Sequence, residues 1–199
     1  KKTSMKKRTF IKTTLLGLAA LALPKKVSAL EYYPNGSDMK WAVLYSTWCG
    51  SSRDAGVWIS EGMDGIANVF DVRENPDLSR YEHIVVGGSI RSGVTSDVMQ
   101  EYLKLNAGIL KSKIRGLFVV CGNRMQAPGP EQTTTLIDNH LAKLCGVASV
   151  PSKVFLGRIT MGLLDASSKE MMTSMNMPEY DNLKREDCMA FGKEVLGSI

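Results

Sequence analysis

The chain has 199 residues, 44% of them hydrophobic, a size and composition that suit one domain with its own core. Its formal net charge is +5, but eight of its 25 basic residues and none of its 20 acidic residues lie in the first 29 positions. The other 170 residues hold 17 basic and 20 acidic side chains, a net charge of −3, so we expect no nucleic-acid partner.

Residues 1–29 have the pattern of an export signal. Six basic side chains lie within the first twelve positions, and an apolar run from Leu15 to Leu23 follows. The sequence Val27-Ser28-Ala29 is a typical small-residue cleavage site. The apolar run is too short to span a bilayer comfortably. We therefore expect this segment to be removed and residues 30–199 to form a single domain.

The basic part of this segment also suggests a route. The run from Lys7 to Lys12, Lys-Arg-Thr-Phe-Ile-Lys, resembles the twin-arginine export motif, with lysine in place of the first arginine. That difference leaves the ordinary route for unfolded chains open as well. Either route predicts an exported protein, periplasmic or otherwise extracytoplasmic, that meets the membrane only through an uncleaved signal.

Short apolar runs then alternate with segments of helical character. This alternation predicts an α/β fold with a five-stranded parallel sheet, right-handed crossovers and helices on both faces, in three layers. The predicted strands are Trp41–Tyr45, Asn68–Val72, His83–Val86, Gly116–Cys121 and Lys153–Leu156, and the predicted helices are Ser52–Met63, Ser96–Asn106, Glu131–Leu144, Arg185–Leu196 and a short one around Ser168–Met175.

The first predicted strand runs into a loop of small hydroxyl-bearing residues around Gly50, and a helix is expected to start at Ser51 or Ser52. The first amides of a helix lack intrahelical acceptors, the helix dipole favours an anion, and hydroxyl groups add donors. The loop has neither the lysine-containing phosphate loop of nucleotide hydrolases nor the GxGxxG of dinucleotide-binding folds. Residues 46–52 therefore predict a phosphate site made of hydroxyls and amides.

Parallel sheets bind ligands beyond the carboxyl ends of their strands. The loops 46–52, 89–95 and 122–129 all follow predicted strands, so we expect them to line one site. A second interpretation stays open, because Trp48-Cys49-Gly50 and Val150-Pro151-Ser152 look like the active-site and cis-proline segments of thioredoxins. Ser52 stands where the second cysteine of a CxxC couple would be, which argues against dithiol chemistry.

The other reactive side chains point to no metal or hydrolase centre. No cysteines have metal-ligand spacing, and neither histidine has a convincing triad partner. A bridge between Cys49 and Cys121 is conceivable in an exported protein. The methionines near position 174 can bind Cu(I), but methionine is also ordinary core filler; they are Met171, Met172, Met175 and Met177.

Two motifs together resemble the flavodoxin-like family. Residues 45–52, Tyr-Ser-Thr-Trp-Cys-Gly-Ser-Ser, are similar to the FMN-phosphate loop of flavodoxins. Residues 81–93, which end in Gly-Gly-Ser-Ile-Arg-Ser-Gly, look like the third strand and flavin loop of the quinone-dependent protoporphyrinogen oxidases, a branch of that family. The resemblance covers residues 40–125 well and the rest only in the order of its elements.

The resemblance implies a flavodoxin-like fold with strand order 2-1-3-4-5 and an FMN cofactor. The implied function is an oxidoreductase or electron-transfer protein whose flavin exchanges electrons with a quinone or a redox partner protein. Carried over by position, the FMN phosphate would be surrounded by Thr47, Cys49, Gly50, Ser51 and Ser52, the ring would lie beside Ser89, Ile90, Arg91, Ser92 and Gly93, and Cys121, Gly122 and Asn123 would close its other side.

The sequence departs from the family at two positions. Ser92 stands where members commonly place an aromatic ring on the flavin, and Cys49 stands where a hydroxyl-bearing residue is usual. Trp48 is a candidate for the missing stacking partner, or a simple packing aromatic. Arg91 would stabilise the charge of a reduced flavin or guide an acidic partner. These departures support an alternative function, a flavodoxin-like binding or interaction module that has lost FMN.

Overall fold

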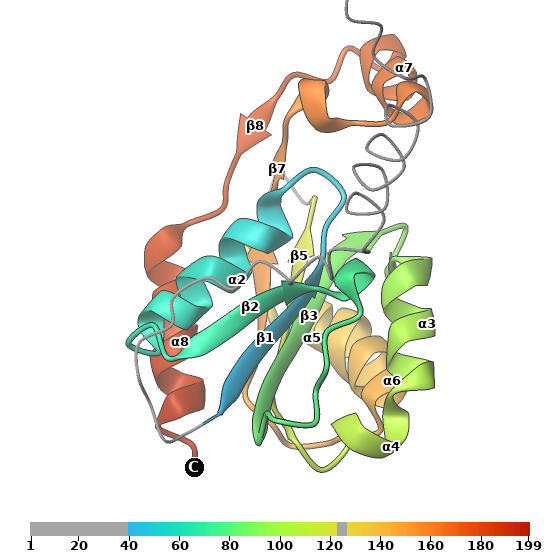
Figure 1. The fold of residues 1–199 in the computed structure, drawn as a ribbon. Coiled ribbons are helices and arrows are strands. Elements are labelled where there is room, and N and C mark those ends of the chain that lie inside the picture. Colours follow the sequence, from blue (N-terminus) through green and yellow to red (C-terminus); the bar gives the residue numbers. More distant parts are fainter. Residues whose placement is uncertain (1–39, 123–126) are drawn as a thin grey trace, which may run out of the picture.

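The computed structural model describes residues 40–122 and 127–199. The predicted export signal and Asn123 lie outside these residues. Five parallel strands form the sheet in the order β2-β1-β3-β5-β6 (Figure 1). Numbered along the chain, this is the predicted order 2-1-3-4-5, which is confirmed. The strands are β1 (Trp41–Ser46), β2 (Ala67–Asp71), β3 (His83–Arg91), β5 (Ile114–Cys121) and β6 (Ser152–Leu156).

Side chains that alternate along each strand supply a separate core on each face of the sheet. In β1, Ala42 and Leu44 join one core, whereas Val43 and Tyr45 join the other. Helices α2 and α8 cover the Val43 face, and the helices from α3 to α6 cover the opposite one (Figure 1). Their bounds are α2 (Ser51–Gly62), α3 (Asp97–Leu105), α4 (Ala107–Leu110), α5 (Pro130–Thr133), the π-helical η3 (Thr134–Leu141), α6 (Ala142–Cys145) and α8 (Arg185–Leu196).

Strand β3 is longer than the sequence predicts. It continues through Arg91 and pairs with the short antiparallel strand β4 (Val94–Thr95), the sixth strand of the sheet. Ser92 and Gly93 form the turn with φ angles of 52° and 84°, as in the two-residue turns that suit the twist of a hairpin. The prediction that residues 89–95 form a loop is therefore wrong, because this segment is a β-hairpin.

A small lobe formed by residues 158–181 stands beyond the carboxyl ends of the strands (Figure 1). It contains β7 (Arg158–Ile159), η4 (Met161–Leu163), α7 (Ala166–Ser174) and β8 (Tyr180–Asp181), and its two strands pair antiparallel. Ile159 and Met172 form a small buried cluster with Cys49 of the loop after β1. The lobe thus packs on the predicted phosphate loop, and α7 confirms the short helix expected there.

Two alternatives from the sequence, the thioredoxin interpretation and the cysteine bridge, can now be decided. The Trp48-Cys49-Gly50 loop follows a strand of a five-stranded parallel sheet, so the thioredoxin interpretation is wrong. All four cysteines are buried and free, so Cys49 and Cys121 are not bridged. Within residues 40–122 and 127–199, no helix has the length and apolar character to cross a membrane. The same residues contain no cluster of histidine, cysteine and carboxylate side chains able to hold a metal ion.

Candidate functional site

The loop between β1 and α2 has the backbone of an anion site. The Gly50 amide donates to Thr47 Oγ1 at 2.9 Å, and Gly50, at the N-cap of α2, has a φ of 90° that glycine adopts at little cost. The first intrahelical bond of α2 runs from the Asp54 amide to the Gly50 carbonyl at 3.2 Å. The amides of Ser51 and Ser52, in the first turn of the helix, therefore have no intrahelical acceptor and can donate to an anion.

The hydroxyl groups of the loop differ in their surroundings. Ser52 is fully buried, and its Oγ has no hydrogen-bond partner among the described residues. A buried hydroxyl without a partner is costly, so a ligand oxygen that accepts from it would be stabilising. Ser51 is also buried, and a Cβ at Gly157 would lie 3.5 Å from its Oγ and 2.9 Å from Val120. Glycine at position 157 thus leaves room beside the Ser51 hydroxyl.

Cys49 differs from its neighbours in orientation. Its side chain is only 4% exposed, and its Sγ donates to the carbonyl oxygen of Arg158 at 3.1 Å. The thiol therefore points into the small cluster beneath the lobe. Cys49 can offer a bound anion its backbone, while its side chain joins the loop to the lobe.

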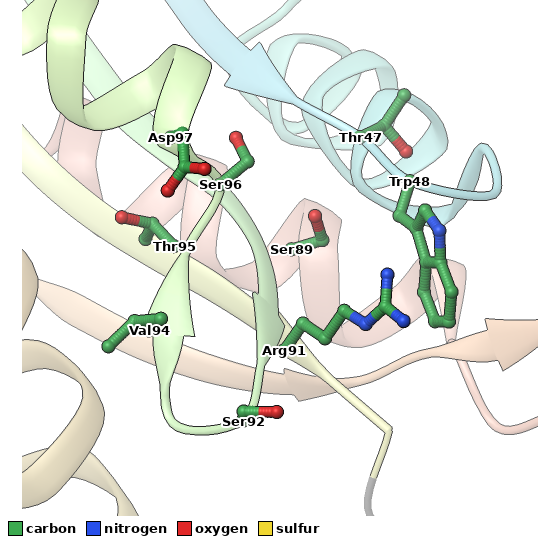
Figure 2. A pocket seen from close by; sticks show the side chains of 9 residues that line it. All are labelled: Thr47, Trp48, Ser89, Arg91, Ser92, Val94, Thr95, Ser96 and Asp97. Atoms are coloured by element: carbon green, nitrogen blue, oxygen red, sulfur yellow. The ribbon is translucent and has the colours of Figure 1, made fainter. Parts of the chain in front are cut away.

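A cavity of about 350 Å³ lies next to this loop. That volume is within the usual range for small-molecule sites, about 300–1,000 Å³. Figure 2 shows that its walls come from three places: the loop after β1, the β3–β4 hairpin and the start of α3. Its lining residues are Thr47, Trp48, Ser89, Arg91, Ser92, Val94, Thr95, Ser96 and Asp97.

The structure brings some of the predicted site residues together and separates others. Ile90 does not line the cavity and packs against the core beneath α3. Cys121 pairs with Ile90 inside the sheet, and the Gly122 carbonyl accepts from the Tyr180 hydroxyl at 2.9 Å. Gly93 belongs to the hairpin turn and is not part of the lining.

Sequence reasoning missed the wall that the start of α3 provides. The predicted helix begins at Ser96, and Ser96 caps the observed helix, because its Oγ accepts from the Met99 amide at 3.3 Å. The same hydroxyl donates to Ser46 Oγ at 3.0 Å, which ties α3 to the end of β1. A capping signal gives no information on which strand the cap will face, so the cavity role of Ser96 could not be found in this way.

A cation also lies beside the loop. Arg158 forms an ion pair with Asp54 in the first turn of α2 and lies 3.5 Å from Asp181. Burial opposes the charge of Arg158, but hydrogen bonds and attraction from Asp54 and Asp181 outweigh burial and raise its pKa. A Cβ at Gly50 would lie 3.6 Å from Arg158 Nη2. Arg158 thus brings a partly buried, carboxylate-paired positive charge to the loop from a distant part of the sequence.

A second cavity, of about 390 Å³, lies on the other side of the same loop, toward β2. Its charged side chains include Arg53 and Arg73, and each is already paired with a neighbouring carboxylate, Asp54 and Asp71. The cavity beside β3 is the better ligand site, because it joins the phosphate loop to the Ser-Ile-Arg motif.

Comparisons with known proteins agree with this geometry. Residues 42–184 match the family model for a flavodoxin domain. Protoporphyrinogen IX dehydrogenase (quinone) of Escherichia coli (strain K12) is 28% identical over 111 residues, which are 53% of this chain and 59% of that protein. The match thus spans less than two thirds of the length of that curated relative.

Two solved structures are similar in fold. A flavodoxin from the domain Archaea has a TM-score of 0.51 and 15% identity, with 80% of this chain and 97% of that chain covered. Flavodoxin 1 from Bacillus cereus has a TM-score of 0.51 and 14% identity, with 80% and 99% covered. Together with the strand order and the match over residues 42–184, these likenesses show that the chain belongs to the flavodoxin domain family.

Proposed function

We propose that this chain binds FMN and acts as an exported oxidoreductase or electron-transfer protein. The observation that carries the proposal is the buried, unpartnered hydroxyl of Ser52 at the start of α2. A phosphate oxygen at this place would accept from the hydroxyl and from the amides of Ser51 and Ser52 in the first helical turn. FMN is the cofactor typical of the family, and its phosphate has the chemistry that this loop can bind.

The two parts of FMN have separate places in this proposal. Thr47, Gly50, Ser51 and Ser52 hold the phosphate, and the cavity bounded by the β3–β4 hairpin takes the ring. The flavin supplies the electron-transfer chemistry when it is bound, while the protein binds and orients it. Cys49 supports the loop from below through its bond to Arg158.

The electron partner we propose is a quinone or a redox protein. The Escherichia coli relative is named as a quinone-dependent dehydrogenase, and this name is the support for a quinone. We also propose that the chain is exported, on the strength of the basic and apolar pattern of residues 1–29. Fractionation with sequencing of the mature N-terminus tests this, and intact protein in the cytoplasm that keeps Lys7 and Arg8 would contradict it.

Titration by flavin fluorescence tests the binding proposal. FMN is expected to bind at least about tenfold more tightly than riboflavin, because charge-assisted bonds to phosphate are stronger than neutral ones. Ser51→Asp is expected to abolish this difference by repelling the phosphate. Ser112→Asp, with the same change of charge at an exposed turn, is the matched control and is expected to preserve it.

A binding module without FMN is the second candidate function. It is favoured by Ser92, which brings no ring to the cavity, and by Arg91, which lies over the face of Trp48. Equal affinity for FMN and riboflavin, or binding of neither, would contradict the FMN proposal and support this alternative.

A further inference from the structure

Three side chains from distant parts of the sequence meet beside the cavity, and we call Trp48, Arg91 and Asp165 the clasp. The guanidinium carbon of Arg91 lies 4.5 Å from the centre of the Trp48 ring, a cation–π contact. Arg91 Nη1 lies 3.9 Å from Asp165 Oδ2, and the indole N–H of Trp48 donates to the same oxygen at 3.1 Å. Figure 2 shows Arg91 extended from β3 toward the indole.

Within the clasp, the side chain of Asp165 is held in place by hydrogen bonds from α7. As the N-cap of α7, it accepts from the hydroxyl of Ser168 at 2.6 Å, from the hydroxyl of Ser167 at 2.7 Å and from the Ser168 amide at 2.9 Å. These bonds, that from the Ser168 hydroxyl foremost, hold the pKa of Asp165 well below its usual range. The carboxylate therefore stays charged at physiological pH and keeps both Arg91 and the Trp48 edge in place.

The indole face of Trp48 is the surface on which a planar ligand in the cavity would stack. Trp48 is the one aromatic side chain among the nine residues that line the cavity, and Ser92 provides no second ring. Arg91 already lies over one face of the indole. Because cation–π contacts at exposed sites and aromatic stacking are similar in strength, Arg91 and an aromatic ligand compete for that face.

We propose that Arg91 sets the affinity of the cavity for planar aromatic ligands by occupying the Trp48 face until a ring displaces it. The proposal rests on the proposed function for the identity of the ring, a flavin. It gives Arg91 a different role from the one that the family resemblance implies. Its guanidinium lies 3.9 Å from the Asp165 carboxylate and over the indole, so it competes with the ring instead of stabilising it.

The test compares riboflavin and FMN binding in Arg91→Ala and the unmodified chain. Arg91→Ala is expected to tighten riboflavin by about three- to tenfold and FMN by the same factor, because the phosphate contacts are unchanged. Asp165→Ser keeps a capping side chain on α7 but removes the carboxylate. It is therefore also expected to tighten the binding of both flavins, by a smaller factor than Arg91→Ala. Arg80→Ala is the matched control, because Arg80 lies over Tyr81 at 5.2 Å, at the opposite end of β3; it is expected to change neither affinity.

A second measurement tests the clasp without a ligand. Acrylamide is expected to quench Trp48 fluorescence more strongly in Arg91→Ala, and Trp48→Phe identifies the Trp48 signal. If Arg91→Ala binds flavin no more tightly than the unmodified chain does, the proposed role of Arg91 is overturned and the proposed function is not. Failure of both the unmodified chain and Arg91→Ala to bind either flavin overturns the proposed function together with this role.

Discussion

His140 joins the helical layer to the wall of the cavity. Its Nε2 accepts from the Thr95 amide at 2.9 Å and lies 3.1 Å from the Thr95 hydroxyl. Only the neutral imidazole has a free electron pair at this nitrogen, so protonation removes the acceptor. Burial lowers the pKa of His140 from its ordinary value of 6.5. The ring is therefore a neutral support for the β3–β4 hairpin at physiological pH.

This arrangement predicts that stability depends on pH. The folded-state pKa lies below the unfolded value, so the unfolded chain takes up the proton first as the pH falls. The stabilisation from His140 is complete above about pH 6.5 and is lost as the pH falls through the folded pKa. We expect the urea midpoint of unfolding to fall as the pH falls through this window. In His140→Gln, the urea midpoint is expected to depend less steeply on pH. Burial also lowers the pKa of His83, so His83 accounts for a further part of the pH dependence. The same pH dependence of the urea midpoint in His140→Gln and in the unmodified chain would contradict the prediction.

At the residue scale, local sequence identifies the phosphate loop but not the side chains that support it. The glycine, the hydroxyls and the helix start are neighbours in sequence, so short-range physics is enough to find them. Arg158 and Asp165 contact Cys49 and Trp48 across 109 and 117 positions. No local pattern encodes a contact of that separation, and the inward turn of the Cys49 thiol depends on it.

At the element scale, α2 and α8 pack with their backbones in contact, and glycines make this possible. A Cβ at Gly192 would overlap the Ile59 carbonyl oxygen, and one at Gly62 would overlap that of Met189. We expect Gly192→Ala to lower the free energy of unfolding by about 2–3 kcal/mol, the upper range for overpacking. Gly108→Ala in α4 is the control, since no atom lies within 4 Å of its added Cβ. Because alanine has the higher helix propensity, Gly108→Ala is expected to raise the free energy of unfolding by up to about 1 kcal/mol. The same change in both variants, measured by urea unfolding, would contradict this view of the interface.

The regular elements could be predicted because their signals are local. All five parallel strands and the helix Arg185–Leu196 lie where the apolar runs and periodicity place them. The β3–β4 hairpin could not be predicted in this way, because its turn needs a positive φ at Ser92, a residue type that seldom adopts one. The two strands of the lobe, β7 and β8, could not be predicted for a different reason. The elements of the lobe are short and are stabilised by packing on the Cys49 loop more than by periodicity of their own.

At the scale of the whole molecule, the lobe is a cover over one side of the phosphate loop and takes no part in the two main cores. The buried residues of those cores all lie outside residues 158–181. Replacing residues 160–179 by a short Gly-Ser linker is therefore expected to leave the sheet folded, with its far-ultraviolet circular dichroism retained. The same change removes Met172 from its contact with Cys49.

The deletion is expected to make one thiol reactive. Cys49 is 4% exposed in the intact chain and loses Met172 from its apolar cover. Cys121, Cys145 and Cys188 stay in the main cores, and burial raises the pKa of Cys145 and of Cys188 to about 12. Labelling with a thiol reagent should therefore be slow for the intact chain and fast for one equivalent after the deletion. Cys49→Ser in the deleted chain should remove the fast phase. Fast labelling of Cys49 in the intact chain would show that the lobe does not cover the loop, because a thiol reacts only where the reagent can reach it.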